Sequence, residues 1–275
     1  MNKIIKNTLF QARQAQKKRK HSTKPCPDQC IGKIDYTTQT GTFAFTGKVK
    51  TKYSTGLDRK NIDDSFVDHS ANSIVLVLES PHTQEYDEYK KPIGPAYGKT
   101  GYNINEYLED ILNEALSRNI IVRPLKSASY DLIVMNAIQY QTSLGVSTCI
   151  YRDAMFLRCW EDVNFRKSFY KRLRNIMDKQ TSCIVINCCT RGQHLDLLTT
   201  HSGSLGSSKS KDKSYFDELG IDYQNWNLEE YTLKECVKRI MFKVKRHRST
   251  GMQWLHISHP SSWSRNSANR ELRKY

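Results

Sequence analysis

Short apolar runs alternate along the chain with stretches of helical periodicity, and this alternation restricts the possible folds more than any other feature. The apolar runs have the length of buried parallel strands and span 73–80, 130–137, 182–188 and 252–258. Between them, apolar residues fall on one helical face within 104–116, 165–176 and 233–244. Strands that alternate with helices form sheets covered on both faces. The sequence therefore predicts a three-layer α/β/α fold with a central, mostly parallel four-stranded sheet.

The segments outside this pattern are polar. Residues 1–25 contain eight Lys or Arg and no Asp or Glu, which is typical of a basic arm that binds phosphate. Residues 26–275 are expected to form a single domain, with a Ser-, Gly- and Lys-containing insertion near 194–230. No apolar run approaches the roughly 18 residues that span a bilayer. We expect a cytoplasmic protein that does not associate with membranes.

The chain is strongly basic. Lys and Arg total 43 against 28 Asp and Glu, which gives a formal net charge of +15. An excess of this size favours a polyanionic partner, because phosphates neutralised by the protein release counterions. A surface that serves only solubility is the alternative, but a smaller charge is enough for that purpose. We therefore expect DNA as the partner and a monomeric protein.

Polar residues follow three of the four predicted strands, at the point where each strand ends. Because ligands bind at the carboxyl ends of strands in such sheets, these residues are candidates for one site. They are Glu79, Ser80 and His82 after the first strand, Asn136 at the end of the second, and His259 with Ser261 after the fourth.

In the same order, these strand ends resemble motifs of the uracil-DNA glycosylase superfamily, most closely its iron–sulfur branch. The segment LESPHTQEYDEYKKPIGPAYGKTG resembles GEAPG followed by an acidic residue and PF-x-G-x-x-G. VMNAIQYQ resembles TN-x-VKC, and SHPSSWSRN resembles the HPS motif. The resemblance covers roughly residues 73–270. It implies a monofunctional DNA glycosylase, an enzyme that flips a base out of DNA and hydrolyses its N-glycosidic bond to leave an abasic site.

The resemblance also implies a role for each residue. His259 would stabilise the negative charge that grows on the departing base. Glu79 would hold a water or support the sugar cation, and Ser80 stands where many members carry a water-activating side chain. Asn136 would read the edge of the flipped base, because its amide offers both a donor and an acceptor. His82 occupies a position that faces the base.

Two further segments are expected to contact DNA. The glycine-rich loop would let backbone N–H groups approach phosphate, and the HPS segment places an apolar side chain beside a cation. A packing role is the alternative for the tryptophan. The expected DNA-binding residues are Gly98, Lys99, Thr100, Gly101, Ser261, Trp263 and Arg265.

The chain departs from the family at positions that affect substrate and cofactor. His82 replaces a small glycine, so the target is uracil or a modified cytosine of phage DNA, the latter implying antiviral defence rather than repair. Tyr140 replaces the cysteine of TN-x-VKC, so we expect no cofactor. The alternative that stays open is an iron–sulfur or zinc site formed by Cys26, Cys30, Cys149 and Cys159.

Functions other than a monofunctional glycosylase fit the sequence less well. A catalytically inactive DNA-binding module with the same fold is the alternative. A nuclease would need a carboxylate cluster for metal, and Asp87, Glu88 and Asp131 do not form a recognisable one. The GKT sequence lacks the spacing of a phosphate-binding loop. None of the expected catalytic or base-binding residues is a lysine, so no Schiff-base nucleophile is expected among them.

Overall fold

The computed structural model describes most of the chain between residues 22 and 275. The described residues are 22, 24–62, 71–122, 124, 127–143, 149–192, 232–247 and 251–275, with side chains from 152 onward in the segment 149–192. Nearly all of the expected basic arm and the whole insertion near 194–230 lie outside this set. Within it, no helix is long and apolar enough to cross a membrane.

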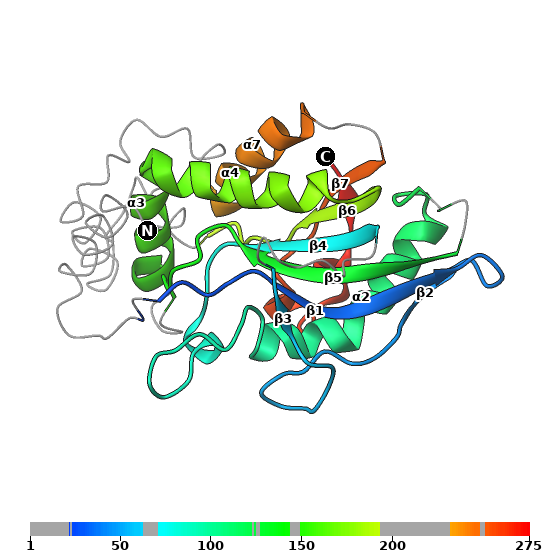
Figure 1. Cartoon of the computed structure of the whole chain (residues 1–275), viewed down its shortest axis with the longest axis horizontal. Helices are drawn as coiled ribbons and strands as arrows, with labels where there is room; N and C mark the ends of the chain where they lie inside the picture. Colours follow the sequence, from blue (N-terminus) through cyan, green and yellow to red (C-terminus); the bar gives the residue numbers. More distant parts are fainter. Residues whose placement is uncertain are drawn as a thin grey trace, which may run out of the picture.

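The described strands form one mixed sheet of eight strands, in the order β2-β1-β5-β4-β6-β7-β8, with β3 paired to β1 (Figure 1). The parallel strands at its centre are β5 (Ala128–Asn136), β4 (Asn72–Leu78), β6 (Ser182–Asn187) and β7 (Met252–His256). The antiparallel strands are β1 (Gln29–Thr37), β2 (Thr42–Phe45), β3 (Lys60–Asn61) and β8 (Arg273–Lys274). The four central strands correspond to the four apolar runs, so the prediction of an α/β protein with a mostly parallel central sheet is confirmed. The expectation of only four strands was wrong, because antiparallel strands extend both edges of the sheet.

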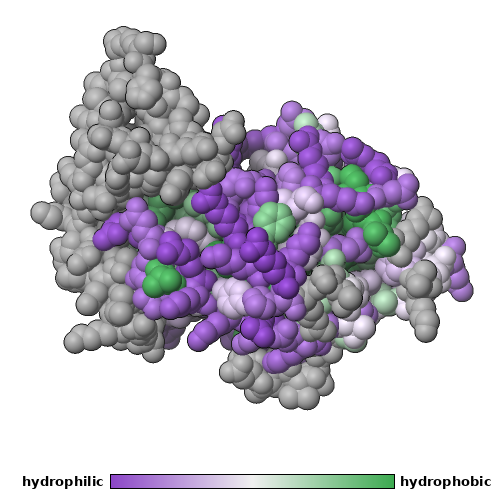
Figure 2. Space-filling model, turned by 90° about the horizontal axis from the view of Figure 1, so that it is seen from above, coloured by the Kyte–Doolittle hydropathy of each residue, from purple (hydrophilic) through white to green (hydrophobic). Residues whose placement is uncertain are grey.

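Helices pack on both faces of this sheet (Figure 1). The longer helices are α2 (Lys99–Ser117), α3 (Met155–Glu161), α4 (Val163–Asp178) and α7 (Leu233–Lys245). Short helices are η1 (Thr83–Glu85), η2 (Cys149–Ala154), η3 (Pro260–Ser262) and η4 (Ser267–Arg270). The protein has two hydrophobic cores, one on each face of the sheet, because successive side chains of β4 point to opposite faces. Ile74, Leu76 and Leu78 pack with residues of α2 on one face. Val75 and Val77 pack with residues of α3, α4 and α7 on the other. Seen from above, the described surface is mainly hydrophilic, with separate hydrophobic patches (Figure 2).

The strand order creates a crevice at the carboxyl end of β4. The strands that follow β4 in the parallel set, β5 and β6, pair with opposite sides of it. Helix α2 lies in the first connection and α4 in the second, and they cover opposite faces. Ligands bind in open α/β sheets where consecutive connections diverge in this way. The topology therefore places a ligand site beside the last residues of β4 and β6.

A buried ion pair fixes the neighbouring end of β5. Arg172 of α4 donates to both carboxyl oxygens of Asp28 at 2.7 Å. The same guanidinium donates to the carbonyl oxygens of Asn136 and Ala137, at 2.9 and 3.1 Å. Burial raises the pKa of Asp28, and the contact with Arg172 opposes that rise. This network satisfies carbonyl groups that the sheet leaves free where β5 ends.

Candidate functional site

A cavity of about 560 Å³ lies at the carboxyl ends of β4, β6 and β7. Its lining comes mainly from the segments that follow these strands and from the start of α2, with further residues from η2 and α7. It brings together most of the residues that the sequence predicted for the site: Glu79, Ser80, His82, Gly98, Lys99, Thr100, His259, Ser261 and Arg265. Asn136, Gly101 and Trp263 do not line it.

His259 presents a hydrogen-bond donor to this cavity. Its Nδ1 accepts the backbone N–H of Ser261 at 3.2 Å and lies 2.8 Å from the Ser261 Oγ. A backbone N–H can only donate, so Nδ1 carries no proton and a neutral ring holds its proton on Nε2. Burial lowers the pKa of His259; Glu79 opposes this, and nearby Arg152 lowers the pKa further. The ring is therefore a neutral donor near pH 7.

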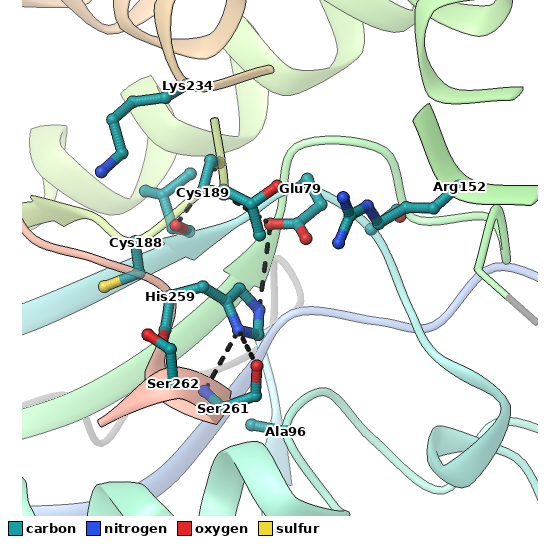
Figure 3. A network of polar contacts seen from close by, with 12 residues as sticks. Glu79, Ala96, Arg152, Cys188, Cys189, Lys234, His259, Ser261 and Ser262 are labelled. Carbon is teal, nitrogen blue, oxygen red and sulfur yellow. Dashed lines mark hydrogen bonds and ion pairs between the residues drawn. The ribbon is translucent and has the colours of Figure 1, made fainter. Parts of the chain in front are cut away.

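Glu79 faces this donor from the end of β4. Its Oε2 lies 3.9 Å from the His259 Nε2 (Figure 3). The same oxygen accepts the backbone N–H of Thr190, which follows β6, at 3.3 Å. The Arg152 guanidinium points toward Glu79, while its Nε donates to Asp153 at 2.6 Å (Figure 3). The segments that contain Arg152, Thr190 and His259 are distant from one another in sequence, and together they surround the buried carboxyl group of Glu79 (Figure 3).

His82 is held in the same manner as His259. Its Nδ1 accepts the backbone N–H of Gln84 at 3.3 Å, which caps η1 and leaves Nε2 as the protonated nitrogen. Burial lowers the pKa of His82, and His259 lowers it further. The cavity is therefore lined by two neutral imidazoles. Ser80 lines it with a hydroxyl that pairs with the hydroxyl of Thr142.

The glycine-rich loop meets the cavity at the start of α2. Gly98 is the N-cap of this helix, and Lys99 and Thr100 form its first turn. The N–H groups of a first helical turn have no partner within the helix, and they favour anions. Gly101 was predicted to contact DNA, but it is buried, and a Cβ there would clash with the carbonyl oxygen of Ala96. Its glycine serves the close packing of α2 against the loop.

Two further predictions need correction. Trp263 is 1% exposed, and its indole N–H donates to the carbonyl oxygen of Ser258 at 2.9 Å. It is a packing residue rather than an exposed wedge, whereas Arg265 is exposed at the cavity. Asn136 is also 1% exposed and lies behind the lining, where its amide affects the Glu85 carboxyl. In this structure Asn136 is therefore not positioned to contact a ligand in the cavity directly.

The cavity also contains residues that were not predicted. Thr190 and Arg191 follow β6, so the rule applied to the other strand ends would have identified them. Lys234 lines the cavity from the first turn of α7, and its Nζ donates to the carbonyl oxygen of Ile257 at 2.7 Å. Burial lowers the pKa of Lys234. For Arg152 and Lys234 the local sequence carries no signal, because helices far along the chain bring them here.

Cys26, Cys30 and Cys159, three of the four cysteines considered for a metal site, are not part of the cavity lining. Burial raises the pKa of Cys30 to about 11 and also raises the pKa of Cys26, so both are thiols near neutral pH. Cys159 is buried in α3, and the Cys149 side chain lies outside the described residues. Among the described side chains, no group of three or more His, Cys, Asp or Glu is arranged to hold a metal ion.

The arrangement combines a neutral donor with a carboxyl group across one cavity that also has a cationic lining. The cations are Lys99, Arg152, Arg191, Lys234 and Arg265. Such a site favours a reaction in which negative charge grows beside the donor and positive charge beside the carboxylate, on a substrate that carries phosphate. No protein-family model, curated protein or solved structure matches the chain.

Proposed function

We propose that the protein is a monofunctional DNA glycosylase that flips a base into this cavity and hydrolyses its N-glycosidic bond. The observation that carries the proposal is the 3.9 Å approach of the His259 Nε2 to the Glu79 Oε2 at the carboxyl ends of β7 and β4. As the bond breaks, the base gains negative charge and the sugar becomes an oxocarbenium ion. The neutral N–H of His259 stabilises the base, and Glu79 stabilises the sugar or holds the attacking water.

The fold supports the same proposal. Four parallel strands with helices on both faces agree with the three-layer arrangement expected for the uracil-DNA glycosylase superfamily. The cavity of about 560 Å³ is in the range that accommodates ligands much larger than one pyrimidine ring. This volume has room for uracil or for a modified cytosine of phage DNA, and the latter target would imply a role in antiviral defence.

Abasic-site formation tests the proposal. The purified protein is incubated with DNAs that carry uracil, 5-hydroxymethylcytosine, glucosylated 5-hydroxymethylcytosine or ordinary bases, and alkali then cleaves any abasic site. We expect cleavage of one modified substrate by the native protein and none by the His259→Ala variant. DNA binding without cleavage of any substrate would instead identify an inactive DNA-binding module.

Removing cations from the cavity rim is expected to weaken DNA binding in a salt-dependent way. Lys99→Ala and Arg265→Ala each remove an exposed charge at the cavity. Each lost phosphate contact reduces the slope of log K against log salt by about 0.9. Fluorescence anisotropy with labelled DNA between about 50 and 200 mM salt measures this slope.

Lys179→Ala is the matched control for that experiment. Lys179 is exposed and caps the end of α4 directly before β6, so it lies at the opposite edge of the parallel strands. Its removal is expected to leave the slope unchanged. Equal slopes for all three variants and the native protein would place the DNA elsewhere on the surface.

A further inference from the structure

Glu85 is a buried acid that belongs to the cavity lining. It ends η1 and lines the cavity, although it is only 4% exposed. Its Oε1 accepts the backbone N–H of Ala96 at 2.8 Å. Its Oε2 is buried and has no hydrogen-bond partner among the described residues. Because buried polar atoms are rarely left without a partner, this oxygen is suited to a group that arrives with a ligand.

Asn136 lies behind Glu85 in a similar state. It is 1% exposed, and neither polar atom of its amide has hydrogen-bond geometry with a described protein group. The amide is nevertheless near enough to Glu85 to lower the pKa of that carboxyl. Since Glu85 lines the cavity and Asn136 does not, Glu85 is the polar group that a bound base would meet here.

The surroundings favour the protonated form of Glu85. Burial raises the pKa of Glu85 to about 8, against the opposing effects of the Ala96 N–H, the Arg59 guanidinium and the Asn136 amide. Arg59 is itself engaged by the carbonyl oxygens of Pro95 and Ala96. The groups that face Glu85 or share its cavity include Cys26, Arg59, Glu79, His82, Lys99 and His259. Near pH 7 most Glu85 side chains therefore carry a proton.

We propose that the Glu85 hydroxyl donates a hydrogen bond, and finally its proton, to the departing base, and that Asn136 positions Glu85 for this transfer. The inference rests on the glycosylase function proposed above. As the glycosidic bond breaks, its electron pair moves onto the base, which takes the proton at a carbonyl oxygen or ring nitrogen and leaves neutral. Water adds to the sugar carbon and releases a proton, which restores the acid. The substrate class is thus a base that presents an acceptor atom to Glu85.

The pH dependence of base release tests this role, with Glu85→Gln as the decisive variant. Glutamine keeps an oxygen for the Ala96 N–H and places an N–H donor where the hydroxyl stood, but it does not ionise. Single-turnover rates of the native protein are expected to fall about tenfold per pH unit above pH 8. The variant is expected to lose about 100-fold or more of the native rate at pH 7, because an amide cannot transfer a proton, and to lack that fall. Asn136→Ala is expected to move the fall to higher pH, since it removes a group that lowers the pKa of Glu85.

An infrared measurement separates this inference from the proposed function, because it needs no activity. A protonated carboxyl band is expected near pH 7, lost above about pH 8 to 9 and absent from Glu85→Gln but not from the exposed control Glu88→Gln. Absence of the band in the native protein would overturn the inference whether or not the protein releases bases. A folded Glu85→Gln variant that stays within about threefold of the native rate at pH 7 would also overturn it, while leaving the glycosylase intact. Absence of base release by the native protein, with the band present, would refute the proposed function and with it the transfer.

Discussion

Replacing His259 with alanine is expected to slow base release by about 100- to 1,000-fold, the loss typical of removing one donor from an oxyanion site. The donor is fixed before substrate arrives, because the Ser261 N–H holds Nδ1 and so leaves the proton on Nε2. Burial lowers the pKa of His259 as well, so the ring stays neutral and needs no reorganisation during reaction. DNA affinity is expected to change much less than rate, because the donor acts mainly on charge that develops in the transition state.

Single-turnover kinetics with excess protein measure this loss, and Ser261→Ala is the matched control. That variant removes the Oγ at 2.8 Å from the ring but keeps the backbone N–H that fixes the tautomer. A loss below about tenfold is expected for it, the rough equivalent of one hydrogen bond. If His259→Ala matched the native rate, another group would have to stabilise the departing base.

Replacing Trp263 with alanine is expected to destabilise the protein by about 3–5 kcal/mol, the range for deleting a large aromatic from a core. The side chain is among the largest that the structure buries completely, and it packs in the core formed on the α2 side of the sheet. Its indole N–H also satisfies the Ser258 carbonyl directly before His259. Urea unfolding monitored by circular dichroism measures the change as a shift of the midpoint.

Two other variants of the same segment calibrate that result. Arg265→Ala alters an exposed side chain and is expected to change the unfolding free energy by less than about 0.5 kcal/mol. Trp263→Phe keeps most of the packing but leaves the Ser258 carbonyl without its donor, so an intermediate loss is expected. If Trp263→Ala left the free energy of unfolding unchanged but weakened DNA binding, the prediction that Trp263 contacts DNA would be correct after all.

The parallel core was predictable because its signal is local. A strand covered by helices on both faces is apolar at most positions, and β4 reads NSIVLVL, with apolar residues throughout 74–78, for this reason. The antiparallel strand β1 was not predicted. β1 reads QCIGKIDYT, with Lys33 and Asp35 among its apolar residues, so neither period stands out. Its pairing with β2 and β5, including the 3.9 Å approach of Lys33 to the buried Asp131, is decided by contacts between distant segments.

The sequence by itself indicated the edge of the sheet at which the candidate site lies. Parallel strands end at one edge of their sheet, so Glu79 and His259 were expected at the same edge once their strands were identified, and the His259 Nε2 lies 3.9 Å from the Glu79 Oε2 there. Only the tertiary structure decided which side chains face the cavity, because the turn that follows each strand, and the packing around it, set their directions. That packing directs Trp263 into the core, places Asn136 behind Glu85, and brings Lys234 to the cavity from α7.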